Sequence, residues 1–212
     1  MKNAIAILSA TESEQNPLRD LLGDRCAGRD LFWHVGGIGA GATAGAALRI
    51  IRDRRPGLII QAGIAGALPH KHLSVGDTVL VRSDYQADLG AWRPETGLFE
   101  PFDTLPEAEV IVCPYAEPLR EHFRPIAARS VNSACSPLPL RGGEALESME
   151  GAAFFGVCAA EKTPFLQLRS VSNQVGEPRI RWRIPEALDA LAWSLAVLLN
   201  VLSDYNLSNP NA

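Results

Sequence analysis

Short apolar runs alternate along the chain with longer segments whose apolar residues recur at helical spacing. The apolar runs predict strands at residues 4–9, 31–35, 58–61, 77–81, 110–113, 127–131 and 165–171. The helical pattern covers residues 16–22, 40–53, 149–161 and 185–203. Residues 90–110 are rich in Pro and Glu and predict a long loop. Such alternation indicates an α/β fold with a largely parallel or mixed central sheet.

Composition narrows the class of protein. A chain of 212 residues that is 47% hydrophobic suits a single domain over 1–212. The net charge of -4 gives no reason to expect nucleic-acid binding, and the basic run at 49–55 is typical of a solvated helix end. Asp189 and Asn200 interrupt the most apolar segment, 187–202, so no membrane span is predicted. The first residues predict a strand without a signal peptide, so we expect a cytoplasmic protein.

Cysteine and histidine positions indicate neither a metal site nor disulfides. The residues concerned are Cys26, Cys113, Cys135 and Cys158, with His34, His70, His72 and His122. No pair of cysteines has C-x-x-C spacing, and no Cys/His spacing resembles a zinc site. A reduced protein without a structural metal is therefore expected.

The glycine-dense stretch HVGGIGAGATAG at 34–45 has two interpretations. Gly37, Gly39 and Ala42 fit the loose form of a dinucleotide-binding loop. Such a loop should follow the first strand of a βαβ unit and precede an acidic residue about 20 positions on, and this chain has neither feature. The other interpretation is a tight strand-to-helix turn, which glycine permits.

Polar residues gather where strands end, which is where ligands bind in α/β folds. Glu12 and Glu14 follow the first strand, Glu150 begins a helix, and a buried strand ends on Ser172 and Asn173. Each has an ordinary explanation, because acidic residues stabilise helix starts and Ser-Asn suits a turn. Carboxylates after the first strand and at a helix start, together with an amide at a strand end, indicate a binding site.

The order of several motifs resembles the nucleoside phosphorylase and nucleosidase superfamily. These are GIGAGATAGAAL, QAGIAGAL followed by VGDTVLV, ESMEGAAFF, and PFLQLRSVSNQVG. Within it, ADLGA, SMEGAAFF and SN-x-VG followed by RWRIPEAL are similar to the futalosine hydrolase family. The resemblance spans nearly the whole chain. It implies a three-layer α/β/α sandwich, a strand-to-helix turn at 34–45, a nucleoside substrate and no cofactor.

The resemblance also implies roles for individual residues in cleaving an N-ribosidic bond. Glu14 matches the acid that orients and deprotonates water, with Glu12 as the less favoured alternative. Glu150 matches the carboxylate that accepts hydrogen bonds from the ribose hydroxyls. Further substrate contacts are expected at the positions that match the family's pocket, namely Met149, Ile64 and Gly66.

Asn173 bears on the leaving base, because adenine-releasing nucleosidases of the superfamily carry Asp at the matching position. An asparagine amide has two N–H donors, which suit the neighbouring O6 and N7 acceptors of hypoxanthine. A 6-oxopurine is therefore predicted. Phosphorylases of the superfamily carry Arg and Ser in the loop that here contains Gln61 and Ile64, so water is the expected nucleophile.

The substrate of the futalosine hydrolase family carries an aromatic carboxylate beyond its ribose. Arg179, Arg181 or Arg183 could pair with it, Arg179 being the preferred candidate, although a solvated basic segment is an equal interpretation. Between residues 128 and 147 the chain is shorter than its relatives and lacks their base-stacking aromatic. Either another aromatic such as Phe154 takes its place, or the pocket is looser than in the relatives.

Three functions remain open at this point. They are hydrolysis of futalosine, hydrolysis of another purine nucleoside such as inosine or an adenine nucleoside, and nucleoside binding without turnover. Retention of both Glu14 and Glu150 favours an enzyme. Members of the superfamily are usually homo-oligomers whose neighbouring subunit helps to close the pocket, so a homodimer or larger assembly is expected.

Overall fold

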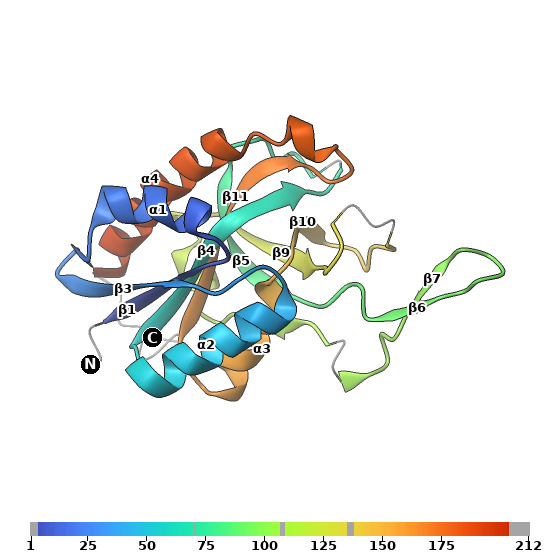
Figure 1. Ribbon diagram of the computed structural model, residues 1–212, viewed down its shortest axis with the longest axis horizontal. Helices are drawn as coiled ribbons and strands as arrows, with labels where there is room; N and C mark the ends of the chain where they lie inside the picture. Colours follow the sequence, from blue (N-terminus) through green and yellow to red (C-terminus); the bar gives the residue numbers. More distant parts are fainter. Residues whose placement is uncertain (1–3, 70, 107–108, 135–137, 204–212) are drawn as a thin grey trace.

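The computed structural model describes residues 4–69, 71–106, 109–134 and 138–203 (Figure 1). The strands are β1 Ile5–Ser9, β2 Arg25–Cys26, β3 Arg29–Val35, β4 Leu58–Ala67, β5 Thr78–Asp84, β6 Gly90–Trp92, β7 Phe99–Pro101, β8 Ile111–Val112, β9 Pro125–Ser130, β10 Glu144–Ser148 and β11 Phe165–Gln174. The α-helices are α1 Glu12–Leu22, α2 Ala40–Arg54, α3 Gly151–Ala160 and α4 Ile184–Ser203. Short 3₁₀ turns cover η2 Glu117–Leu119 and η3 Arg179–Arg181.

A nine-stranded mixed sheet forms the centre of the described part of the chain. Its order is β10-β9-β5-β11-β4-β1-β3-β2, with β8 paired to β5. The pairings β1–β3, β1–β4, β4–β11, β5–β9 and β9–β10 are parallel. The pairings of β5 with β11 and of β2 with β3 are antiparallel. The α/β class and the mixed sheet are therefore confirmed.

One additional pairing closes part of this sheet on itself. Strand β10 pairs with β9 and also, in antiparallel register, with β4, through Leu146 opposite Ala67 and Glu147 opposite Gly66. Strands β4, β11, β5, β9 and β10 therefore form a ring. The ends of β10 and β11, which are separated in sequence by α3, therefore both lie beside the end of β4.

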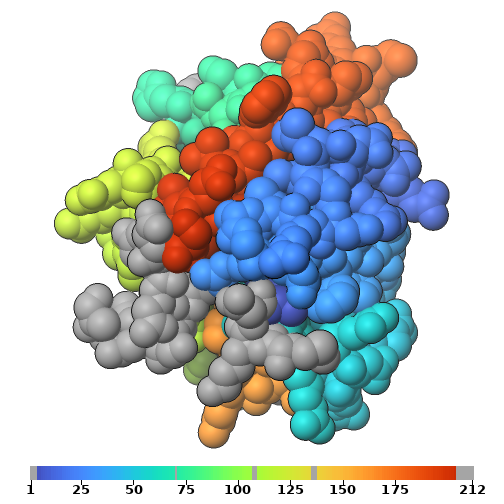
Figure 2. Space-filling model, turned by 90° about the vertical axis from the view of Figure 1, so that its left-hand side faces the viewer, coloured from blue at the N-terminus to red at the C-terminus, as the bar shows by residue number. Residues whose placement is uncertain are grey.

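Helices cover the sheet on two sides. Helices α1 and α4 lie next to each other on one side, and α2 and α3 lie together on the other (Figures 1 and 2). The amphipathic pattern of α4 explains its position, because Leu191, Leu195 and Leu199 are all buried. By length and composition α4 could span a membrane, but here its leucine face packs into the core.

Four features differ from the sequence-based predictions. Helix α1 begins at Glu12 rather than at residue 16, because Thr11 forms a capping box with Glu14. Strand β4 continues through Gly63 and Gly66 to Ala67, since β11 and β10 pair with it beyond residue 61. The predicted loop at 90–110 contains the β6–β7 hairpin, which projects from the body (Figure 1). Strand β10 was not predicted, because two glutamates interrupt its apolar pattern.

The glycine-dense stretch is a turn between β3 and α2, as the resemblance implied. Gly37 and Gly39 have φ angles of 92° and 88°, in the region that favours glycine. The predicted helix end at 49–55 is confirmed as well, with Arg52 and Arg54 in the last turn of α2. Cys135 and His70 lie outside the described residues, while Cys26, Cys113 and Cys158 are free thiols.

Candidate active site

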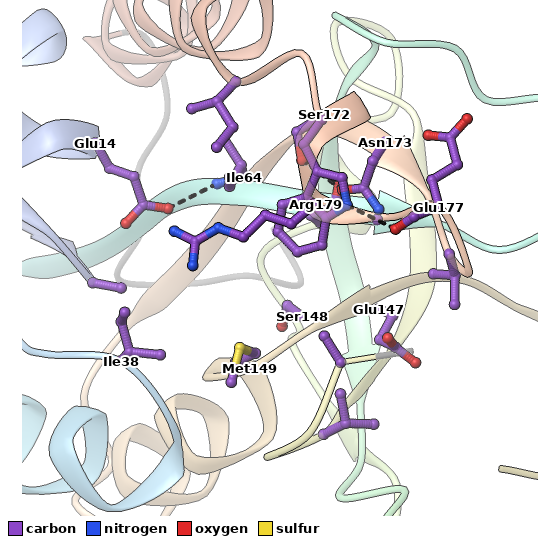
Figure 3. Close-up of a pocket in the computed structure, with 18 of the residues that line it drawn as sticks. Glu14, Ile38, Ile64, Glu147, Ser148, Met149, Ser172, Asn173, Glu177 and Arg179 are labelled. Carbon is purple, nitrogen blue, oxygen red and sulfur yellow. Dashed lines mark hydrogen bonds between the residues drawn. The ribbon is translucent and has the colours of Figure 1, made fainter. Parts of the chain in front are cut away.

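A pocket of about 820 Å³ lies where β1, β4, β10 and β11 end (Figure 3). Its walls come from the β1–α1 turn, the ends of β4 and β11, the β10–α3 junction and the segment leading into α4. All the site residues predicted from the sequence line it: Glu14, Ile64, Gly66, Met149, Glu150, Asn173 and Arg179. The fold therefore brings these residues to one site.

Glu14 serves the first turn of α1 and the pocket at once. Its Oε2 accepts hydrogen bonds from the backbone N–H of Thr11 at 3.0 Å and from the Thr11 hydroxyl at 3.2 Å. Its Oε1 accepts from the Ile64 backbone N–H at 3.1 Å, which ties the helix start to β4. Glu12 is exposed and does not line the pocket. The geometry therefore favours Glu14 over Glu12 as a site residue.

Glu150 stands at the N-cap of α3, yet its side chain makes no capping hydrogen bond. Its Oε1 accepts from the Gly39 backbone N–H at 3.2 Å, and its Oε2 accepts from Arg169 Nη2 at 3.2 Å. The carboxylate stands at the start of the helix as expected for an acidic residue, but its hydrogen bonds go to other elements. The glycine-rich turn holds Glu150 from one side and the arginine holds it from the other.

Arg169 is a central residue that the sequence analysis missed. It is 1% exposed, donates to Glu150 and also donates from Nη1 to the Ile64 carbonyl at 3.1 Å. A Cβ at residue 63 would collide with this guanidinium and lie 2.9 Å from Glu14 Oε1, so a larger residue there would displace both side chains. Arg169 thus passes close to both carboxylates. The available signal was a single cation inside the apolar run LQLRSVSN.

Asp84 lies near the Arg169–Glu150 ion pair and is fully buried at the end of β5. Its Oδ1 accepts from the Ser130 hydroxyl at 3.0 Å and from the Tyr85 backbone N–H at 2.8 Å. Its Oδ2 has no hydrogen-bond partner among the described residues. Burial raises the pKa of Asp84 to about 7, and the Ser130 hydrogen bond only partly opposes this rise.

The amide of Asn173 has a defined orientation. Its Nδ2 donates to the Gln174 carbonyl at 2.9 Å, and its Oδ1 accepts from the Ser172 hydroxyl at 2.8 Å. Because a backbone carbonyl only accepts, the NH₂ group must lie on the Gln174 side. A Cβ at Gly66 would meet Asn173 Nδ2 at 3.2 Å, so the glycine gives this amide its space. Asn173 is therefore a fixed polar group in the pocket wall rather than an exposed turn residue.

The aromatic wall of the pocket differs from expectation. Phe154 is fully buried and packs edge-on against Phe155 and Phe165, so it cannot stack on a base. Phe154 was therefore the wrong candidate. Trp182 lines the pocket instead, and its Nε1 donates to the Glu177 carbonyl at 3.1 Å.

The three arginines proposed for the distal carboxylate differ in their position relative to the pocket. Arg179 lines the pocket, whereas Arg183 pairs with Glu186 at 3.1 Å and Arg181 is exposed outside it. Arg179 is the one Lys or Arg among the described lining residues. Gln61 is buried and accepts from Gln167 Nε2 at 2.6 Å, so it provides no phosphate ligand. The described residues contain no cluster of His, Cys, Asp and Glu that could hold a metal ion.

Solved structures share this architecture. The 5'-methylthioadenosine/S-adenosylhomocysteine nucleosidase of Neisseria meningitidis superposes with a TM-score of 0.75 at 20% identity, covering 94% of this chain and all of that one (100%). The 5'-methylthioadenosine nucleosidase of Arabidopsis thaliana gives 0.78 at 19% identity and 98% coverage of both chains. The futalosine hydrolase of Helicobacter pylori gives 0.76 at 18%, covering 95% of this chain and 99% of that one. The fold is therefore that of the nucleosidases.

Sequence comparison defines the family. No protein-family model matches the chain. It is 33% identical over 180 residues to the futalosine hydrolase of Streptomyces coelicolor, covering 78% of this chain and 75% of that protein. It is 34% identical over 152 residues to the Thermus thermophilus futalosine hydrolase, covering 65% of this chain and 67% of that protein. This chain is a nucleosidase, an N-glycosyl hydrolase. It belongs to the futalosine hydrolase family.

Proposed function

We propose that the protein hydrolyses the N-ribosidic bond of futalosine, releasing hypoxanthine and dehypoxanthine futalosine, as a step of the alternative menaquinone pathway. The observation that carries this proposal is the meeting of Glu14, Glu150 and Asn173 in one pocket of a futalosine hydrolase family member. A site that only bound nucleosides would not need a carboxylate placed to activate water.

The geometry supports a division of labour between the two carboxylates. Glu14 accepts three hydrogen bonds from the protein, and a carboxylate has about four acceptor positions, so a water molecule can also bind it. Glu14 takes a proton as the water oxygen bonds to C1′. Glu150 accepts from the ribose hydroxyls and stabilises the positive charge that develops on the ring.

Asn173 acts on the leaving group. As the C1′–N9 bond breaks, its electron pair passes to the purine, and negative charge spreads toward N7 and O6. One N–H of Asn173 is used by the Gln174 carbonyl, and the second can donate to the base. Transfer of the proton from Glu14 back to the purine completes the turnover.

The remaining lining residues suit the rest of the substrate. Ile64, Gly66 and Met149 shape the space around the sugar and base. Arg179 and Trp182 at the mouth supply a cation and an aromatic face for the benzoate-like end of futalosine.

We also infer the finer organisation of the molecule. Residues 1–212 constitute one nucleosidase domain in a three-layer α/β/α arrangement, located in the cytoplasm. We expect two or more copies to associate, and the exposed side chains of Trp92, Trp193 and Val197, at 48%, 67% and 50%, are candidate contacts. The oligomeric state is checked by light scattering.

The test is a direct assay of base release. Purified protein is incubated with futalosine, inosine or methylthioadenosine, with and without phosphate, and the products are separated by chromatography. We expect hypoxanthine from futalosine at a rate that does not depend on phosphate. Adenine release alone would indicate a different nucleosidase, a phosphate requirement would indicate a phosphorylase, and binding without release would indicate a lost activity.

A further inference from the structure

Besides Glu14 and Glu150, a further carboxylate lies in the pocket wall, across Gly66 from Asn173. Gly66, the last residue but one of β4, lies between two partners, with Asn173 of β11 in register on one side and Glu147 of β10 on the other. Both side chains line the pocket (Figure 3). Because they lie two strands apart in a closed ring, at most about 10 Å separates their Cα atoms, and their side chains reach the pocket from either side of Gly66.

Glu147 is held by a buried ion pair. Arg129 donates to its Oε2 from Nε at 3.0 Å and from Nη2 at 2.7 Å, and Arg129 Nη1 reaches the Leu138 carbonyl at 3.3 Å. The two residues are 6% and 2% exposed. Replacing such a pair by apolar residues is often neutral or stabilising, so stability alone does not account for it. Its position in the wall of the pocket indicates a role toward the ligand.

The hydrogen-bonding groups of the purine indicate what a carboxylate at this place would recognise. In a 6-oxopurine the ring nitrogen N1 carries a hydrogen, next to O6, whereas in adenine N1 has a lone pair and accepts. A carboxylate only accepts hydrogen bonds. It therefore matches N1–H of hypoxanthine and opposes N1 of adenine.

We propose that Glu147 is a specificity-determining residue that accepts a hydrogen bond from N1–H of the base, while the second N–H of Asn173 donates to the edge that carries O6 and N7. Arg129 is a positioning residue that fixes the carboxylate and compensates its charge. The proposal deepens the hydrolase function proposed above and rests on it for the identity of the substrate. The base would then be bound by side chains of β10 and β11, the two strands that flank Gly66.

The experiment compares futalosine with its 6-amino counterpart as the ratio of kcat/KM. The amide of Glu147→Gln either accepts from N1–H or donates to N1, so the preference for the 6-oxo substrate should fall about 10- to 100-fold, as expected for a hydrogen bond to a charged group. Glu144→Gln is the matched control. Glu144 is a buried glutamate of the same strand that binds the Tyr85 hydroxyl at 2.9 Å and lies outside the pocket, so its variant should keep the wild-type ratio.

A second variant and a binding measurement guard against a folding defect. The double variant Arg129→Met/Glu147→Met removes both charges, folds more readily than a variant with an unpaired arginine, and should also lose the preference. Calorimetry with hypoxanthine and adenine should show the same loss in affinity ratio for both variants. An unchanged ratio in folded protein would overturn the role of Glu147 and leave the ion pair as structural. Failure of the wild type to cleave futalosine would sink the proposed function instead, while the binding arm would still decide the role of Glu147.

Discussion

Replacing Glu14 by glutamine separates its two tasks. Loss of a general base typically slows a reaction about 10²- to 10⁴-fold, and we expect base release from Glu14→Gln to fall by that amount. Substrate affinity should change little, because the residue acts on water and not on the nucleoside. The isosteric amide keeps the size of the side chain, so the pocket retains its shape.

The structure also sets the cost in stability. Glutamine has one acceptor oxygen, and if it continues to serve Thr11, its NH₂ group faces the Ile64 backbone N–H, donor against donor. An unsatisfied buried donor costs about 1–3 kcal/mol, less than the roughly 5–15 kcal/mol that stabilises a typical domain. The variant should therefore unfold at lower urea concentration yet remain folded in the assay.

The assay measures hypoxanthine release by chromatography, futalosine binding by calorimetry and unfolding by urea. Glu12→Gln is the control, since Glu12 is in the same helical turn but is exposed and outside the pocket. It should change stability by no more than about 0.5 kcal/mol and leave turnover intact. Near-normal turnover in Glu14→Gln would refute the assignment of Glu14 as the base.

Three further predictions concern the surrounding groups. Asn173→Asp sets a carboxylate against the Gln174 carbonyl and removes both amide donors, so kcat/KM on futalosine should fall and relative preference should shift to the 6-amino substrate in parallel assays. Glu150→Ala leaves Arg169 buried without its carboxylate, so urea unfolding should show a loss of about 3–5 kcal/mol, together with a raised KM and a lowered kcat; a loss of stability alone would remove Glu150 from the reaction. Because burial raises the pKa of Asp84 from 3.8 to about 7, the folded state binds its proton more tightly than the unfolded state. The contribution of Asp84 to stability is then complete below pH 4 and is lost as the pH rises to 7. The free energy of unfolding of the wild type minus that of Asp84→Asn should therefore fall between these pH values. A difference that does not change with pH would contradict the raised pKa.

Local patterns were informative where a residue's neighbours in sequence determine its place. The glycines of the β3–α2 turn suit its positive φ angles at Gly37 and Gly39, although the resemblance, and not the local pattern, decided between a turn and a dinucleotide loop. Motif resemblance placed Glu14, Glu150 and Asn173, and the structure brings them to one pocket.

The errors arose where distant segments meet. Strand β10 depends on pairing with β4 and β9, which no local pattern encodes. Arg169 and Glu147 are charged residues in buried strands, and only their partners, Glu150 and Arg129, make burial possible. Phe154 had the right type but faces the core, since its side of α3 packs on Phe165.

The closure of the strand ring affects where the pocket opens by local unfolding. The seam between β10 and β4 consists of two residue pairs, Leu146 with Ala67 and Glu147 with Gly66, so it holds fewer backbone hydrogen bonds than the longer β4–β11 contact. Local opening with little loss of structure is therefore expected there first. A nucleoside that touches both sides of this seam adds its binding free energy to the closed form. Bound substrate thus stabilises the β10–β4 pairing, and amide hydrogens of β10 should exchange with solvent more slowly when substrate is bound.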